Sequence, residues 1–330
     1  SVLTRSQTLR VSDNWALTQV KLGIPIKHWL VDQTLNALTI GYSYSQDYER
    51  SPIYEQRFNW IWKLNLQYGL KISDFLSFSP LGWMKGWDVL GIYSGLKINL
   101  LPSSINTSFD MMRRRQTEQS RYLDFPSPVL REFNAQRQAQ MSWKLSENGF
   151  LNPLFDYSFS TISTLVPFEL DENGKQRTGS ELSKYIFFKN GQLINLGSNT
   201  LHNQVVTINT KPQIPDLFGI SRFIDITSTY SATYTWQNPL QPNPQFVDVA
   251  KNASVNTNLR INQSFKLKAL GDKWFDFVLP KKGTRITESD TTGGLWKGTV
   301  SVLKKIIFDW DKVDFTFNQT SSSLNPGVYG

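Results

Sequence analysis

The chain alternates between apolar and polar residues over unusually long stretches. In ASVNTNLRINQSFKLKA, residues 253–269, apolar residues and one threonine occupy the odd positions with only Gln263 intruding, and the even positions are polar throughout. A period of two is the signature of a β-strand whose two faces meet different surroundings. Because a typical strand has about five or six residues, this pattern predicts an exceptionally long strand with one wet face.

The same alternation recurs along most of the sequence. It is clean at residues 36–48, 57–71, 133–145 and 222–236, and weaker at 4–22, 96–116, 154–166, 200–211 and 311–320. Together with 253–269, these segments predict about ten strands. The pattern therefore predicts an all-β, antiparallel fold.

The connections between these strands are of two kinds, which alternate along the chain. One kind is polar and rich in turn residues, at 46–52, 113–132, 171–199 and 237–245. The other contains short apolar, Trp-rich pieces with helical spacing, at 24–36, 80–91, 214–223 and 295–310. If the strands run up and down, each kind lies at one end of the sheet. This segregation is typical of a sheet that crosses a bilayer, with extended loops at one surface and interfacial helices at the other.

Composition agrees with half-buried strands. Aromatic residues make up 13% of the 330 residues, yet hydrophobic residues are only 39% and the mean hydropathy is −0.35. No run of 18 apolar residues occurs, so no membrane-spanning helix is expected. Cysteine is absent, which excludes disulfides, thiol chemistry and zinc–cysteine sites.

The net charge of +8 would suit an anionic partner. The basic residues are nevertheless scattered, and the one dense run, Arg113-Arg114-Arg115, lies where a strand pattern ends. We interpret this run as a solvated loop end, and no nucleic-acid partner is predicted.

The alternation assigns each strand residue to one of two environments. A strand in lipid must satisfy every backbone polar group through neighbouring strands, so only a closed sheet is stable there. Such a barrel presents apolar residues to lipid and polar residues to a wet lumen. The predicted lipid-facing residues are Leu38, Ile40, Trp60, Trp62, Leu64, Leu66, Leu259, Ile261, Phe265 and Leu267. The predicted lumen-facing residues are Lys63, Asn65, Asn256, Asn258, Arg260, Asn262 and Lys266.

Residues suited to catalysis are sparse. The two histidines, His28 and His202, are far apart and have no ligand cluster around them, which favours a structural or interfacial role. Acidic pairs such as Asp47 with Glu49 fall at loops or strand ends. The sequence therefore predicts neither an enzyme, nor a cofactor site, nor a metal site.

Several segments resemble one family in order and spacing. Residues 13–26 and 31–70 resemble a section of the giant outer-membrane translocon of the Bacteroidetes type IX secretion system, the SprA/Sov family linked to gliding motility. Further resemblances follow in the family's order at residues 100–114, 133–145, 223–237, 254–267 and 313–330. Each pattern is common in barrels, and their order over nearly the whole chain carries the resemblance.

The resemblance implies a transmembrane β-barrel in the bacterial outer membrane, with residues 1–330 as one domain that forms an interior portion of a much longer chain. It implies short interfacial helices in the periplasmic connections and an extracellular loop insertion at residues 167–199. It also implies a wide lumen that passes folded, secreted cargo. The implied partners are the remainder of the same barrel, a plug protein, a smaller barrel that receives cargo, and outer-membrane lipid.

Two departures from the family matter. Family members are several times longer than this chain, and the last segment, NPGVYG, is not the aromatic strand on which a bacterial barrel normally finishes. Two other functions also fit the alternation. One is an outer-membrane porin or small-solute transporter, and the other is a soluble or surface-attached β-sheet protein that binds a glycan or a protein.

Overall fold

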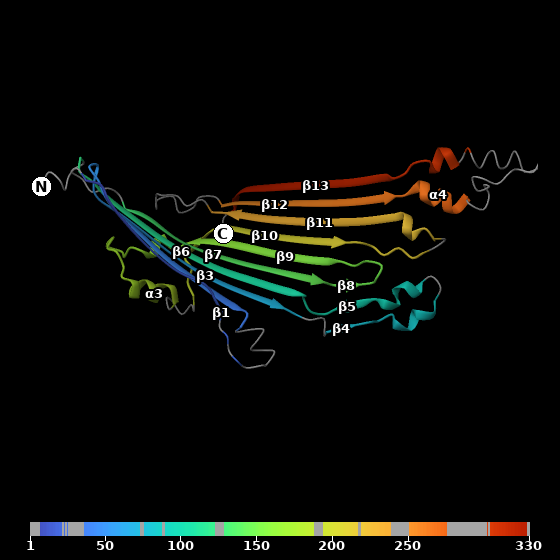
Figure 1. The fold of residues 1–330 in the computed structure, drawn as a ribbon, viewed down its shortest axis with the longest axis horizontal. Helices are drawn as coiled ribbons and strands as arrows, with labels where there is room; N and C mark the ends of the chain where they lie inside the picture. The colour runs from blue at the N-terminus through green and yellow to red at the C-terminus, as the bar shows by residue number, and fades with distance from the viewer. Residues whose placement is uncertain are drawn as a thin grey trace, which may run out of the picture.

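Ten long strands, each paired with its neighbours along the chain, form one antiparallel sheet in the computed structural model (Figure 1). The structure describes residues 7–21, 23, 25, 36–72, 76–87, 90–122, 129–187, 194–216, 219–238, 251–275, 302 and 304–328. In sheet order the strands are β1 (Leu9–Lys21), β2 (Leu38–Arg50), β3 (Tyr54–Lys71), β6 (Ser104–Ser120), β7 (Leu130–Lys144), β9 (Leu154–Thr164), β10 (Ser198–Thr210), β11 (Ile224–Gln237), β12 (Lys251–Phe265) and β13 (Val313–Val328). The predicted antiparallel all-β fold is confirmed.

Among the strand boundaries that differ from the prediction, two change how residues are assigned. β12 ends at Phe265, and helix α4 (Leu267–Phe275) follows. The strand ends there because Phe265 pairs with Ile224, the first residue of β11, so the residues after Phe265 have no partner on β11. Leu267 and Lys266 therefore lie beyond the strand, and their predicted lipid and lumen positions on it were wrong. β6 continues to Ser120, so the arginine run lies inside a strand and is not a loop end.

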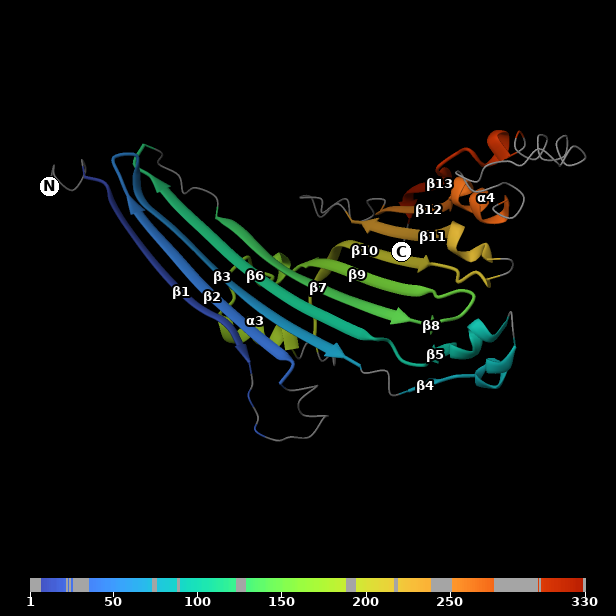
Figure 2. The same cartoon turned by 45° about the vertical axis from the view of Figure 1, so that its right-hand side comes forward.

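The up-and-down order separates the two kinds of connection as the sequence predicts. One end of the sheet holds all the connections that carry the following short elements (Figures 1 and 2). They are β4 (Ser77–Phe78), η1 (Gly82–Gly86), η2 (Leu90–Gly95), β5 (Lys97–Asn99), β8 (Ser146–Glu147), η6 (Ser221–Phe223) and α4. There β4, β5 and β8 form a small three-stranded sheet. The Trp-rich segment at 80–91 forms two short 3₁₀ helices, and most of 24–36 lies outside the described residues.

The connection between β9 and β10 folds back onto the sheet. It contains η3 (Val166–Phe168) and helix α3 (Gly179–Phe187), and Leu182 and Ile186 of α3 pack on Met111 and Phe133 of the sheet. In Figure 2 the helix lies behind β3 and β6. The 167–199 segment, expected as a loop insertion, is therefore in part a second layer on β3, β6 and β7.

The start of α3 is fixed by a reciprocal capping box. The carboxylate of Glu181 accepts a hydrogen bond from the backbone N–H of Thr178 at 2.7 Å, and the hydroxyl of Thr178 accepts one from the N–H of Glu181 at 3.4 Å. The backbone N–H of Thr178, followed by its hydroxyl, holds the pKa of Glu181 below its ordinary value of 4.5.

Acidification should loosen α3. Because the pKa of Glu181 is lower in the folded chain than in the unfolded chain, its contribution to stability is present above about pH 4.5 and is lost as the pH falls through the folded pKa. We expect amide protection factors of residues 179–187, measured by hydrogen exchange, to fall on acidification. Glu181→Gln keeps a hydrogen-bonding cap that does not titrate, so an equally steep fall in that variant would contradict this role.

Candidate functional site

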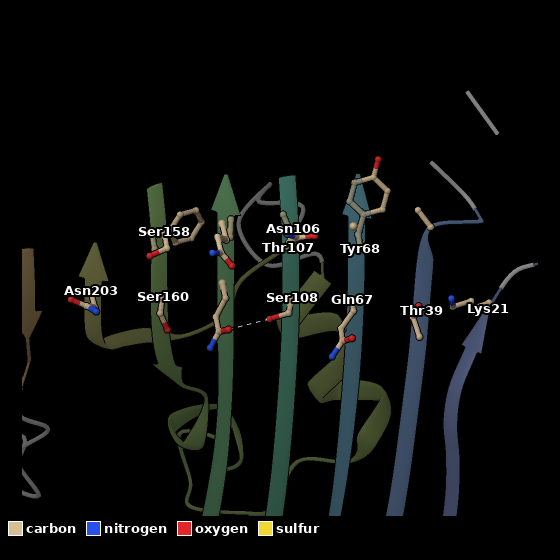
Figure 3. A pocket seen from close by; sticks show the side chains of 16 residues that line it. Lys21, Thr39, Gln67, Tyr68, Asn106, Thr107, Ser108, Ser158, Ser160 and Asn203 are labelled. Atoms are coloured by element: carbon tan, nitrogen blue, oxygen red, sulfur yellow. Dashed lines mark hydrogen bonds between the residues drawn. The ribbon is translucent and has the colours of Figure 1, made fainter. Parts of the chain in front are cut away.

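One face of the sheet carries a continuous row of polar side chains. Residues paired across neighbouring strands give the row Lys21, Thr39, Gln67, Ser108, Gln138, Ser160 and Asn203, which crosses from β1 to β10 (Figure 3). The hydroxyl of Ser108 donates to Oε1 of Gln138 at 3.5 Å. Because paired residues point to the same side of a sheet, the alternation in each strand adds up to one polar face.

The polar face is hollowed. A hollow of about 630 Å³ lies over the row in Figure 3, with its lining drawn from β1, β2, β3, β6, β7, β9 and β10. A second hollow of about 650 Å³ lies further along the same face and includes Lys63, Asn65, Asp110 and Gln136. A lining drawn from so many adjacent strands indicates that the sheet curves toward its polar side.

The structure places the predicted lumen residues together on this face, except Lys266. Lys63 and Asn65 line the second hollow, on β3. The same face carries Asn256, Asn258, Arg260 and Asn262 of β12. Asn256 pairs with Thr233 of β11, and Thr233 pairs with Val205 of β10. Val205 lies in the same cross-strand row as Gln140 of β7. The predicted division into two faces is thus present in the register.

Neighbouring polar side chains satisfy one another. The amide of Asn65 donates to the carboxylate of Asp110, and the amide of Asn258 donates to Asn318 at 3.1 Å and to Thr320 at 3.0 Å. Near the other end of the face, Arg57 lies 3.8 Å from both Glu49 and Glu118. The described part of this face therefore combines hydrogen-bonded amides with charges of both signs.

The predicted lipid-facing residues share the opposite face, except Leu267. Leu38, Ile40, Trp60, Trp62, Leu64 and Leu66 lie there on β2 and β3, and Leu259, Ile261 and Phe265 lie there on β12. Large apolar side chains near both sheet edges are exposed on this face: Trp15 is 72% and Phe315 58% exposed. The cluster under α3 changes the assignment for Trp62 and Leu64, because they pack against protein.

Sequence reasoning missed a buried ion cluster on this apolar face. Glu169, which is 0% exposed, accepts a hydrogen bond from Nε of Arg113 at 2.8 Å, and its second oxygen lies 3.6 Å from Nε of Arg131. Arg113 also stacks on the rings of Trp60 and Phe133. A signal existed in the sequence: Arg113 and Arg131 stand at positions of their strands where the alternation predicts apolar residues.

His202 has a structural setting. Its ring lies 2.6 Å from the hydroxyl of Thr161 and 2.8 Å from the amide of Gln204, and it contacts Phe159 and Tyr234. His28 lies outside the described residues.

Within the ranges that the structure describes, no group of three metal-ligating side chains occurs. None of the helices in those ranges has the length and hydropathy needed to cross a bilayer.

Two comparisons with known sequences found no match. No family model matches the chain, and no curated protein matches it. Function is therefore inferred from the two faces of the sheet and from the sequence resemblance.

Removal of the Glu169 charge should destabilise the layer under α3. In Glu169→Gln two largely buried guanidinium groups lose their counter-ion, which should lower the free energy of unfolding by about 3 to 5 kcal/mol. The matched control is Glu49→Gln, where the partner Arg57 is solvent-exposed and the expected loss is below about 1 kcal/mol. Urea denaturation of both variants measures the difference, and equal losses would show that burial of Glu169 has no energetic consequence.

Proposed function

We propose that this chain is a wall segment of a wide, water-filled outer-membrane β-barrel that conducts proteins, of the type IX secretion kind, without enzymatic activity. The observation that carries the proposal is the pair of faces: one hollowed and polar, one apolar and largely uncovered. A soluble sheet covers its apolar face with a second layer. Here the described residues supply such a layer only over β3, β6 and β7.

Strand length supports a membrane position. β12 has 15 residues and is therefore about 50 Å long, whereas crossing the hydrocarbon layer takes about 9 to 11 tilted residues. The excess would project beyond the bilayer. Exposed Trp15, Leu17, Phe315 and Phe317 would be solvated by acyl chains, which removes the cost of exposing them to water.

The free edges of the sheet support a larger barrel. In the described residues β1 pairs only with β2, and β13 only with β12, so the outer edges of two long strands offer unpaired N–H and C=O groups. Such edges must be paired in lipid. A barrel of ten strands has a narrow interior, and water-filled channels take about sixteen strands or more. Further strands of the same barrel are the expected neighbours of both edges.

A wide lumen lined by amides and hydroxyls would let folded cargo pass without adhering. The other partners follow from the family resemblance: a plug protein, a smaller barrel that receives cargo, and secreted protein as the cargo. The short helices and the small sheet at the α4 end would lie at the periplasmic surface. The second candidate is a porin, because a porin also has a polar inner face and an apolar outer face.

Charge substitutions at neighbouring positions test the membrane position. Ile261→Arg would place a guanidinium in lipid and should cost about 2 to 4 kcal/mol if the site is near the midplane, whereas Asn262→Lys should be tolerated. Folding into lipid vesicles at increasing urea concentrations measures both. Equal effects at the two positions would refute the facing assignment.

Conductance separates the translocon from the porin. A purified barrel in a planar bilayer should show a very large conductance once its plug is removed, because the lumen must admit folded protein. Small, ion-sized conductance in the unplugged barrel would favour the porin. Release of the protein from membranes by carbonate, with dispersion in the absence of detergent, would support the soluble alternative instead.

A further inference from the structure

A separate cavity lies on the apolar side of the sheet, beneath α3. It measures about 640 Å³, within the range of small-molecule sites. Trp62, Leu66 and Phe109 line it from the sheet, and Leu182 and Ile186 line it from the helix. Its walls are almost entirely apolar, which suits a hydrocarbon chain.

Two arginines line this cavity, and they differ in whether they have a charged partner. Arg113 is neutralised by Glu169 at 2.8 Å. Arg137 donates through Nη2 to Oγ of Ser163 at 2.9 Å and to Oδ1 of Asn199 at 2.7 Å, and both partners are uncharged. Among the described residues no carboxylate lies within ion-pair distance of Arg137. Its charge is therefore uncompensated.

Arg137 also has an unused donor. Its Nε atom is buried and has no hydrogen-bond partner in the described part of the chain. A guanidinium offers five N–H donors and is never deprotonated in proteins, so Arg137 keeps its positive charge beside the cavity, and its buried N–H without an acceptor is unfavourable. An anionic group at the cavity would supply the missing counter-charge.

We propose that this cavity binds one acyl chain of an anionic amphiphile, with the carboxylate or phosphate head on Arg137. The apolar walls solvate the chain, and the positive charge of Arg137 selects an anionic over a neutral head. A free fatty acid and an acyl chain of an anionic phospholipid share this chemistry. The proposal does not rest on protein conduction, because the cavity and its arginine belong to the layer under α3.

Photolabelling of the full chain tests the proposal. The probe is hexadecanoic acid with a diazirine near the end of its chain, added to protein purified in an uncharged detergent, and labelled peptides are mapped by mass spectrometry. We expect label on cavity residues such as Met111 and Leu182, and about tenfold less with the matching hexadecanol probe. Competition by unlabelled phosphatidylglycerol, compared with unlabelled hexadecanoic acid, identifies the preferred source of the head.

Two variants separate head-group recognition from general adhesion. Arg137→Gln removes the positive charge but keeps a polar side chain, and should reduce labelling by the acid about tenfold with little effect on the alcohol. The control Arg260→Gln removes an arginine from the polar face and should change neither. Leu182→Trp should fill the cavity and abolish labelling by both probes. Equal labelling by acid and alcohol, unchanged labelling in Arg137→Gln, or label spread over the apolar face of β11 and β12 would each overturn the proposal.

Discussion

Cross-strand register is the constraint on which the rest of this structure depends. Each strand alternates with a period of two, but a two-faced sheet arises only if adjacent strands pair so that polar residues meet polar residues. A slip of one residue in any pair would move every side chain of a strand to the opposite face. The row from Lys21 to Asn203 shows that this agreement persists from β1 to β10. Both the hydrated hollows and the apolar face follow from it.

The segment between β9 and β10 compensates for three arginines that interrupt the apolar face. Arg113, Arg131 and Arg137 stand on the apolar face, where a charge without a counter-ion is unfavourable among apolar side chains. The returning segment brings Glu169 to the first two, and it packs Leu182 and Ile186 of α3 on Met111 and Phe133. Arg137 is left with neutral partners beside the cavity. The insertion thus converts part of an amphipathic wall into a small, conventional core.

The polar face is built differently from a binding site. Its side chains are short amides and hydroxyls that hydrogen-bond to one another across strands, as Asn258 does with Asn318 and Thr320. Its charges are of both signs, as around Arg57. Polar side chains of this kind bind water well, and the apolar residues on the face, such as Met112 and Ile162 in the second hollow, are interspersed among them. This property agrees with passage along the face better than with capture on it.

The sequence by itself determined the strands, the division into two faces and the segregation of connections between two ends. All three depend on local periodicity and on the alternation of connection types, which any up-and-down sheet preserves. Nine of the ten predicted apolar positions and six of the seven predicted polar ones therefore share their faces as expected. The two exceptions, Lys266 and Leu267, lie where β12 loses its partner strand, and the alternation within a single strand cannot reveal that loss.

Tertiary structure alone decided what covers each face. Residues 113 and 169 are 56 positions apart, and no local pattern indicates that they form an ion pair. The polar character of 171–199 suggested an exposed connection, yet its few apolar residues suffice to seat α3 on β6 and β7. Contacts between distant segments depend on how the completed sheet curves and which surface it leaves open. The surroundings of Trp62, Leu64 and Arg137 therefore depend on the complete fold.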